Sequence, residues 1–400
     1  MRILIIHERY RQRGGEDRVF DLESAMLEAR GCQVERLIID NRDIRDGQGQ
    51  LALAANALWS RKGRSLVRDA VRRFRPQVAH IHNWFPLLSP SIHSAIREDG
   101  IPVVQTLHNF RNLCLNGLFF RDGAPCEDCL DSSLKWRGVL RRCYRDDIRA
   151  SATVAALTLL HHHLGTWRRH VDLFLAYSEF SRQRFIAGGL PADRIAIKPN
   201  TTPDPGEDAA SWRHPRRGAV YVGRLSEEKG IGDLVRAWRD MGHTLTVVGD
   251  GPLGEQLRAE ASSEVEFVGW RSPEEVSVLL ARAALVCVPS LCYEQWPMAV
   301  TEAAAHGVAV LASNFGAMGR LIKPRHTGDL VPVGDIRAWR DQAVGLLNAP
   351  ERLAAMGSAA RQSYLDQYSP PSVTDQLLAH YHRLVESRPS RPTPITRLSV

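Results

Sequence analysis

The sequence predicts an α/β protein with two Rossmann-like, doubly wound domains, and three observations carry that prediction. Four hundred residues exceed the usual size of one domain. Short apolar strands alternate with helical patterns along the chain. The alternation starts afresh after a Pro- and Gly-containing stretch at 195–208, which we take as the linker. Open α/β sheets bind ligands at the carboxyl ends of their strands, so we expect both domains to face one cleft.

The first half supplies a complete set of alternating elements. Its expected strands are 2–7, 33–39, 77–82, 102–108 and 173–178, and its expected helices are 16–31, 64–75, 91–98 and 147–163. A long irregular insertion, about 110–145, interrupts them. We therefore assign residues 1–200 to the N-terminal domain.

The second half repeats the pattern. Its expected strands are 218–224, 244–248, 265–269, 284–290 and 308–313, and its expected helices are 229–240, 254–262, 273–282, 297–306, 336–347, 350–366 and 372–386. We assign 201–370 to the C-terminal domain and expect a helix at 371–387 to pack back toward the N-terminal domain. Residues 388–400 are rich in Pro, Ser and Arg and should form a disordered tail.

Charge is distributed unevenly along the chain. Residues 1–200 hold 31 Lys and Arg against 22 Asp and Glu, whereas residues 201–400 hold 21 against 23. The basic half suggests an anionic partner such as a membrane surface or a phosphate-bearing acceptor, although solvated arginine-rich helices would give the same count. Motifs for nucleic-acid binding are missing, so we expect no nucleic acid. The N-terminal apolar run is too short for a signal peptide and no run suits a membrane helix, so we expect a cytoplasmic protein, possibly at the inner face of the membrane.

The stretch 249–254 reads Gly-Asp-Gly-Pro-Leu-Gly between a strand and a helix, which is the G-x-G-x-x-G spacing of a dinucleotide-binding turn. Such a turn should open the first βαβ unit of a domain and be followed by a ribose-binding acid after the next strand. Here it follows the second strand of its domain, and the next strand ends in Gly269 and Trp270. NAD binding is therefore disfavoured. The turn is either purely structural or lies close to a phosphate-bearing ligand.

Two further stretches carry charged residues suited to chemistry. Arg224 lies at a strand end and Lys229 opens the next helix, so the two can converge on a diphosphate. Glu294 lies in the loop after strand 284–290 and Glu302 lies in the following helix, and carboxylates bind vicinal hydroxyls well. Taken singly, each could be an ordinary solvated side chain.

Taken in order, these motifs resemble the retaining glycosyltransferases of the GT-B architecture, and more narrowly the glycosyltransferase group 1 family (family four). They are G-R-L-x-x-x-K-G, V-V-G-x-G-P, "VEFVGW" and E-x7-E in the second half, with "GGEDRVFDLESAMLEARG", "HIHNW" and "TLHN" matching more loosely in the first. The resemblance implies an N-terminal acceptor domain and a C-terminal donor domain. It also implies transfer of a sugar from a nucleotide-diphosphate donor to a glycan or lipid-linked acceptor, as in cell-surface polysaccharide synthesis.

The resemblance also implies roles for single residues. Arg224 and Lys229 would bind the diphosphate, Glu294 the donor sugar and Glu302 the ribose, and His108 would help to position the sugar. The remaining donor-side positions are Gly14, Gly15, Gly223, Gly249, Gly251, Val268, Gly269 and Trp270. No D-x-D metal motif occurs, so basic side chains would replace a catalytic metal and we expect no catalytic cofactor.

Some features depart from the family pattern and leave alternatives open. Glu294-Gln295-Trp296-Pro297 stands where the family often has E-G-F-G, and Arg320 stands where it has an acid, which puts the identity of the sugar in doubt. The alternatives are a nucleotide-sugar epimerase or phosphorylase of the same architecture, or a non-catalytic nucleotide-sugar-binding subunit. The sequence does not fix the oligomeric state.

Four cysteines gather in the insertion: Cys114, Cys126, Cys129 and Cys143. The C-x2-C flanked by two more cysteines fits a structural, four-thiolate zinc site that would order a loop poor in apolar residues. Reduced thiols or a redox pair are the alternatives.

Overall fold

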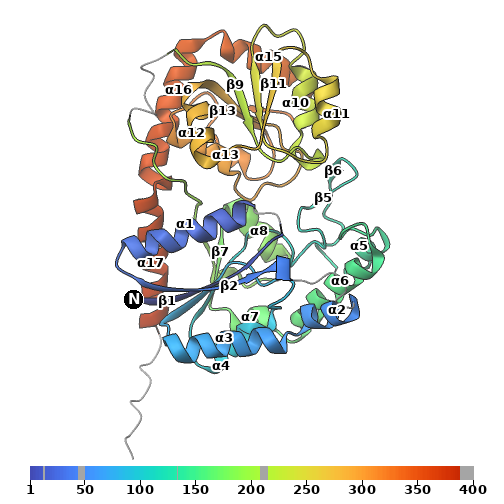
Figure 1. Cartoon of the computed structure of the whole chain (residues 1–400), viewed down its shortest axis with the longest axis vertical. Helices are drawn as coiled ribbons and strands as arrows, with labels where there is room; N and C mark the ends of the chain where they lie inside the picture. Colours follow the sequence, from blue (N-terminus) through green and yellow to red (C-terminus); the bar gives the residue numbers. More distant parts are fainter. Residues whose placement is uncertain (12–13, 44–49, 133, 208–214, 388–400) are drawn as a thin grey trace, which may run out of the picture.

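The chain folds into two parallel α/β units, one stacked on the other (Figure 1). The computed structural model describes residues 1–11, 14–43, 50–132, 134–207 and 215–387. The tail expected at 388–400 lies outside these residues. Among the described helices, none combines the length and the apolar character needed to cross a membrane.

The first sheet has the strand order β2-β1-β3-β4-β7-β8, and every pair is parallel. Its strands are β1 (Arg2–Arg9), β2 (Gln33–Asp40), β3 (Val78–Ile81), β4 (Val103–Thr106), β7 (Leu173–Ala176) and β8 (Ile195–Ile197). Its helices are α1 (Gly15–Ala29), α2 (Gln50–Leu58), α3 (Arg61–Phe74), α4 (Ser91–Glu98), α6 (Ile148–His163), α7 (Thr166–His170) and α8 (Glu179–Ala187), with 3-10 turns η1 (Asn41–Asp43) and η2 (Ala192–Arg194). The insertion adds β5 (Phe120–Arg121), β6 (Ala124–Pro125) and α5 (Trp136–Leu140).

The second sheet has the order β11-β10-β9-β12-β13-β14, again all parallel. Its strands are β9 (Arg217–Val222), β10 (Leu245–Val248), β11 (Val265–Gly269), β12 (Ala283–Val288), β13 (Ala309–Ser313) and β14 (Gly328–Val331). Its helices are η3 (Glu227–Lys229), α10 (Ile231–Ala237), α11 (Gly254–Glu260), α12 (Pro273–Arg282), α13 (Met298–Ala305), α14 (Met318–Leu321), α15 (Ile336–Leu347) and α16 (Pro350–Ser363). The strand order reverses between β9 and β12, which is where open α/β sheets bind ligands.

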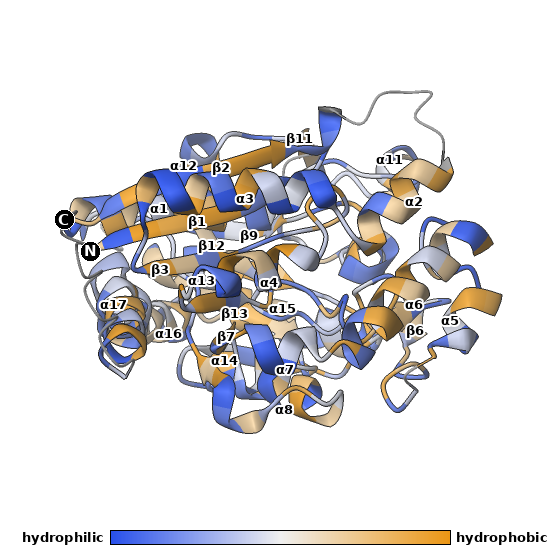
Figure 2. Cartoon of the chain, turned by 90° about the horizontal axis from the view of Figure 1, so that it is seen from below, coloured by the Kyte–Doolittle hydropathy of each residue, from blue (hydrophilic) through white to orange (hydrophobic). Residues whose placement is uncertain are grey.

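Each sheet is buried on both faces, as parallel sheets require. The strand β12 is buried at all six positions, and the alternate residues of β1 face two different clusters. Figure 2 shows β1 in orange beside helices that carry blue turns. Apolar burial on this scale is the main force that holds each half together.

The chain crosses between the two units twice, at the linker and at the turn η4 (Tyr364–Tyr368), and the crossings are joined. The Tyr364 hydroxyl donates to the Thr202 carbonyl (2.8 Å), and the Thr201 hydroxyl donates to the Tyr368 carbonyl (2.5 Å). Helix α17 (Pro370–Glu386) then runs along the first unit beside α1 (Figure 1). Its Leu377 is buried in one cluster with β1.

Three expectations about elements were wrong. Residues 195–197, which we expected in the linker, form β8 at the edge of the first sheet, and residues 328–331 form a strand that we did not expect. The helix expected at 229–240 is broken, because Gly230 takes a φ of +66° and separates the 3-10 turn η3 from α10. A side chain at Gly230 would meet the Pro289 carbonyl oxygen at 2.0 Å, so the loops after β9 and β12 can pack together only around a glycine.

Candidate functional site

The loops that follow β9 and β12 meet where the strand order of the second sheet reverses. The Lys229 ammonium donates to Glu294 Oε1 over 2.6 Å, and the Ser290 hydroxyl donates to the same oxygen over 2.7 Å. The backbone N–H groups of Leu291 and Cys292 donate to the Glu228 carbonyl (2.9 and 3.2 Å). The structure therefore brings together two residues that are 65 positions apart in the sequence.

The Lys229–Glu294 pair fixes the charge of the lysine. Burial lowers the pKa of Lys229, but the negative charge of Glu294 outweighs it and leaves that pKa raised. Lys229 is therefore an ammonium at neutral pH, held beside a carboxylate. A diphosphate anion arriving at this point would find a positioned cation.

Arg224 lies on the same loop as Lys229 and its side chain is exposed. The backbone of this loop is fixed from below, because the Tyr221 hydroxyl donates to the Arg224 carbonyl over 2.8 Å. The exposed guanidinium thus extends from a turn whose backbone is held by a hydrogen bond.

The glycine-rich turn after β10 packs against this loop. Gly249 has a φ of +127°, and a side chain on it would meet the Gly223 carbonyl oxygen at 2.0 Å. A side chain on Gly251 would meet the Leu225 carbonyl oxygen at 2.4 Å, and Leu225 N–H donates to the Asp250 carbonyl over 3.0 Å. The contact between the turn after β10 and the loop after β9 therefore requires glycine at both positions, with or without a bound ligand.

Asp250, whose role the sequence left open, ties this turn to the end of β11. Its carboxylate accepts from the Trp270 backbone N–H over 3.0 Å, and Gly249 N–H donates to the Gly269 carbonyl over 2.9 Å. The Trp270 side chain is 67% exposed, while Val268 is half-buried in the core. The predicted donor-side positions of β10 and β11 thus form one connected edge.

Glu302 lies buried in α13 and forms an ion pair with Arg18, a residue of α1 in the other unit. Because α1 follows β1 and α13 follows β12, the pair joins the carboxyl-end loops of the two sheets. Gly14 and Gly15 begin α1 one turn before Arg18, and a side chain on either would meet no atom within 4 Å. Packing among the described residues gives no reason for glycine at these two positions.

Tyr293, beside Glu294, makes a second contact between the units. Its ring stacks on Phe315 (centroids 4.5 Å apart) and packs on Phe180 of α8 (4.8 Å). The Arg184 guanidinium lies 5.6 Å from the Tyr293 ring centre. The Glu294 loop is thereby anchored on the first unit.

The altered loop after Glu294 has a structural partner. Trp296 donates to the Thr301 hydroxyl over 2.6 Å, and its ring lies 5.2 Å from that of Tyr368 at the second crossing. The bulky residues in place of E-G-F-G thus pack the Glu294 loop against η4.

His108 follows β4, and both of its ring nitrogens have partners inside the protein. Its Nε2 lies 2.9 Å from His82 Nδ1, and the Tyr177 hydroxyl lies 2.8 Å from its Nδ1. Burial, with smaller contributions from His82 and His7, holds the pKa of His108 well below its usual range. The ring is therefore neutral and its orientation is fixed.

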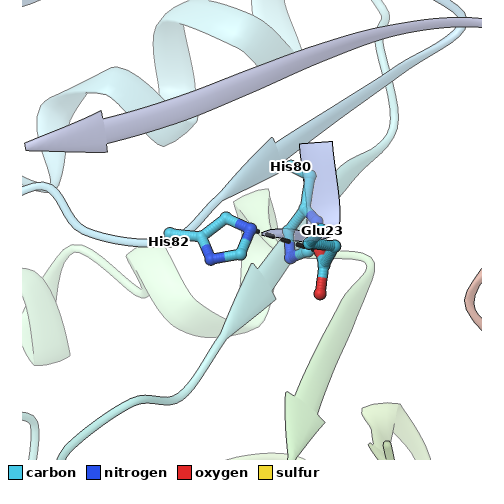
Figure 3. Close-up of side chains that lie close together, drawn as sticks. All are labelled: Glu23, His80 and His82. Atoms are coloured by element: carbon cyan, nitrogen blue, oxygen red, sulfur yellow. Dashed lines mark ion pairs between the residues drawn. The ribbon is translucent and has the colours of Figure 1, made fainter. Parts of the chain in front are cut away.

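Behind His108 lies a buried cluster of Glu23, His80 and His82, whose ligand atoms come within 4.8 Å of one another (Figure 3). Glu23 Oε1 lies 3.0 Å from His80 Nδ1 and 3.2 Å from His82 Nε2, and Glu23 Oε2 accepts a hydrogen bond from Lys198. This cluster is the one group of three or more potential metal ligands found in the described ranges.

The four insertion cysteines are free thiols, and burial, with smaller contributions from Cys114 and Cys126, raises the thiol pKa values of Cys129 and Cys143. Burial raises the pKa of Cys143 to about 11. Within the described residues, however, no three of their sulfurs lie within the 4.8 Å that a shared ion needs. Instead Lys135, itself buried, donates to the carbonyls of Leu113 (2.8 Å) and Cys129 (3.1 Å). The Lys135 ammonium thus helps to hold the insertion in one conformation, a role that we expected zinc to play.

A cavity of about 400 Å³ lies beside this insertion and away from Lys229 and Glu294. Lys135, Trp167 and Gly188 are among its lining residues. None of the residues predicted for donor binding lines it.

Comparison with known proteins assigns both units. The model of the glycosyl transferase 4-like domain matches residues 8–201, and the model of glycosyl transferases group 1 matches residues 216–349. The chain belongs to the group 1 glycosyltransferases. The family resemblance expected from the sequence is confirmed.

The chain is similar to several named proteins. It is 33% identical over 311 residues to a glycogen synthase of Mycobacterium tuberculosis, a match that takes in 73% of this chain and 65% of that protein. This chain thus spans less than two thirds of that relative's length. Among solved structures the chain is similar to sucrose-phosphate synthase of Thermosynechococcus elongatus, with a TM-score of 0.71 and 20% identity over 97% of this chain and all of that one. It is also similar to Anabaena HepE in complex with UDP, with a TM-score of 0.67 and 19% identity over 96% of this chain and all of that one. These likenesses confirm the predicted GT-B fold.

Sequence reasoning missed several residues around the candidate site. Arg18 stands 284 positions from its partner Glu302, and nothing in a local pattern signals a pair at that separation. Glu23 occupies an ordinary helical position, and only the fold shows that it meets His80 and His82. The one usable signal was His80 and His82 at i and i+2 of a strand, which places both on one face.

Proposed function

We propose that this chain is a retaining glycosyltransferase that moves a sugar from a nucleotide-diphosphate donor to a glycan or lipid-linked acceptor in cell-surface polysaccharide synthesis. The observation that carries the proposal is the Lys229–Glu294 pair at the point where the strand order reverses. It sets a fixed cation beside a fixed carboxylate, which suits a diphosphate joined to a sugar. The UDP bound to the similar HepE structure supports a nucleotide donor.

In this proposal Lys229 and Arg224 bind the diphosphate. Glycosyl transfer builds negative charge on the departing nucleoside diphosphate, so a cation fixed in advance lowers the barrier without reorganisation. Glu294 holds hydroxyls of the donor sugar, and Glu302 exchanges Arg18 for the ribose hydroxyls. The exposed edge at Gly269 and Trp270 accepts the nucleobase.

The N-terminal side of the site is assigned to the acceptor and the sugar. The open space around Gly14 and Gly15 lets a ligand approach the start of α1 closely. His108 meets the sugar through a ring edge or its backbone, because both ring nitrogens are engaged within the protein. Retention of configuration, with a donor phosphate oxygen taking the acceptor proton, is taken from the family resemblance.

A donor screen tests the proposal directly. UDP- and GDP-sugars are tried for hydrolysis and for an increase in melting temperature, because a bound donor stabilises the native state. Lys229→Met should lower kcat by about 100-fold or more, the usual effect of removing one transition-state donor. The matched control is Lys323→Met, an exposed lysine of the same unit just before β14, which should keep full activity.

The same screen separates the alternatives. Release of an altered nucleotide-sugar without acceptor would indicate an epimerase, and turnover that requires inorganic phosphate would indicate a phosphorylase. A donor that stabilises the protein but is never turned over would indicate a non-catalytic binding subunit. Activity that survives both Lys229→Met and Glu294→Gln would overturn the site.

We further propose that the chain is cytoplasmic and that the insertion docks on an anionic membrane. The insertion exposes four large apolar side chains, Leu118, Leu134, Trp136 and Leu140, and Ile148 is exposed just after it at the start of α6. The exposed arginines that follow Trp136 are Arg137, Arg141, Arg142, Arg145 and Arg149. Exposed Trp and Leu beside arginine suit the interface of a bilayer with anionic lipids.

Co-sedimentation with vesicles tests the docking. Binding should be stronger to vesicles with phosphatidylglycerol than to pure phosphatidylcholine, and Trp136→Ser with Leu140→Ser should abolish it. Val278→Ser is the control, because Val278 is as exposed as Trp136 (52% each) but lies on α12 in the other unit. Equal binding by the double variant and the control would contradict this docking surface.

We propose a structural zinc on the sequence spacing of the four cysteines alone, because their sulfurs would have to move closer together to share an ion. Metal analysis of the purified protein should find one zinc per chain, lost on replacing Cys126 and Cys129 with Ser. If the purified protein contains no zinc and chelators do not change its melting temperature, the zinc proposal is wrong. Lys135 would then be the residue that orders the insertion.

A further inference from the structure

A row of buried polar side chains leads away from His108 into the first unit. From Tyr177 the row passes to His108 Nδ1 (2.8 Å), from His108 Nε2 to His82 Nδ1 (2.9 Å), and from His82 Nε2 to Glu23 Oε1 (3.2 Å). Figure 3 shows the last contact as a dashed line. Glu23 Oε1 and His82 Nε2 are both buried, and neither atom makes a hydrogen bond of good geometry in the described part of the chain, so the 3.2 Å between them is a close polar contact. Because buried polar atoms need a partner, a small rotation of either side chain would turn this contact into a hydrogen bond.

The row allows one arrangement of protons. Burial raises the pKa of Glu23, but the positive charge of Lys198 outweighs burial and leaves that pKa well below its usual range, so the carboxylate is ionised and can only accept. Burial lowers the pKa of His82 to about 3, so that ring is neutral. His82 then carries its proton on Nε2, facing Glu23, and its Nδ1 must accept from His108 Nε2–H. The remaining nitrogen of His108, Nδ1, accepts from the Tyr177 hydroxyl.

We propose that Glu23 and His82 are positioning residues, which hold the ring of His108 in the Nε2–H tautomer and in one orientation toward the transferred sugar. This inference rests on the proposed function, because it matters for catalysis only if His108 lies beside that sugar. The same logic operates where a buried carboxylate orients a histidine in other enzymes. Here the carboxylate acts through a second imidazole.

Glu23 is itself held from two distant parts of the chain. Lys198, from the linker side of β8, donates to its Oε2, and His80 Nδ1 contacts its Oε1. The Tyr381 hydroxyl of α17 lies 2.6 Å from that same His80 nitrogen. The orientation of His108 thus depends on residues near both crossings between the units.

A metal ion fits the same cluster less well. The Lys198 ammonium already neutralises Glu23, and Tyr381 already occupies the His80 nitrogen that would face an ion. A divalent cation would add two positive charges to a buried site whose charges are balanced. We therefore assign the cluster to orientation, and a metal becomes an outcome of the test.

Two substitutions at one position separate positioning from packing. His82→Asn places an amide oxygen where Nδ1 accepts from His108, whereas His82→Leu fills the space with no acceptor. His82→Leu should lower kcat about tenfold, the order expected from losing one buried hydrogen bond, with donor KM changed less than about twofold. His82→Asn should recover most of that loss. Tyr177→Phe, at the other ring nitrogen, should also lower kcat.

NMR of 15N-histidine-labelled protein tests the same arrangement without turnover. The His108 signals, assigned by their loss in His108→Gln, should show the Nε2–H tautomer in the unmodified chain and a tautomer mixture in His82→Leu. If no donor is turned over, the proposed function fails while the NMR result still decides the proton arrangement. Wild-type kinetics in His82→Leu, an Nδ1–H tautomer in the unmodified chain, or one bound metal ion lost on replacing His80 would each overturn the inference.

Discussion

Two glycines of the proposed donor side should respond to alanine in opposite ways. Gly249 has a φ of +127° and a new side chain there would meet the Gly223 carbonyl oxygen at 2.0 Å. The strained backbone costs about 1–3 kcal/mol and the overpacking a similar amount. Gly249→Ala should therefore lower the free energy of unfolding by about 2–6 kcal/mol.

Gly15→Ala adds the same methyl group in open space. Gly15 is the first residue of α1, and nothing lies within 4 Å of the added carbon. Because alanine is the better helix former, stability should stay constant or rise by up to about 1 kcal/mol. If a donor or acceptor approaches this backbone, the methyl group should weaken its binding by about tenfold, or ~1.4 kcal/mol.

Thermal unfolding and calorimetric titration with the donor found in the screen measure both effects. At roughly 2–4 °C per kcal/mol for a domain of this size, Gly249→Ala should melt about 4–24 °C lower. A Gly249→Ala protein that melts with the unmodified chain would refute the argument from loop contact. Undiminished binding of every ligand by Gly15→Ala would refute the binding role of the α1 start.

Three further predictions concern charged residues. Arg18→Gln should free Glu302 and tighten donor binding about two- to fivefold by calorimetry, and weaker binding would mean that Arg18 itself contacts the donor. Burial raises the pKa of Glu8 to about 7, so between pH 4.5 and 7 the folded chain keeps a proton that the unfolded chain releases, and the free energy of unfolding falls as the pH rises. Glu8→Gln should remove this pH dependence in urea titrations. An unchanged slope of stability against pH in the variant would contradict the prediction. Lys135→Met should leave buried carbonyls unpaired and make the insertion the first site of limited proteolysis, whereas resistance equal to the unmodified chain would show that other contacts order it.

The sequence predicted most strands because their apolar runs are short and bounded by turn residues. It missed β14, where only four residues pair at a sheet edge, and β8, which directly precedes the prolines of the linker. Edge strands contribute few apolar residues, so their pattern is weak. The break at Gly230 was equally invisible, because it depends on how closely the loop after β12 approaches.

The candidate site was predictable only where its residues belong to recognisable local motifs. Lys229 and Glu294 were expected through family motifs, and the fold joins them by a hydrogen bond. The partners Arg18 and Glu23 were not expected, since ion pairs across 284 and 175 positions leave no local periodicity. The glycine-rich turn shows a different limit. Its motif was visible in the sequence, but the close approach of the Gly223 and Leu225 carbonyls, which requires glycine there, was not.

Because α17 packs back on the first unit, it determines when that unit can finish folding during synthesis. Leu377 and Tyr381 complete a cluster whose other members include Ile3, Ile5 and Phe20. A ribosome must therefore synthesise nearly the whole described chain before the earliest strand is covered on that face. Until then this apolar surface faces the solvent or a chaperone, so the unit made first is the last to be finished.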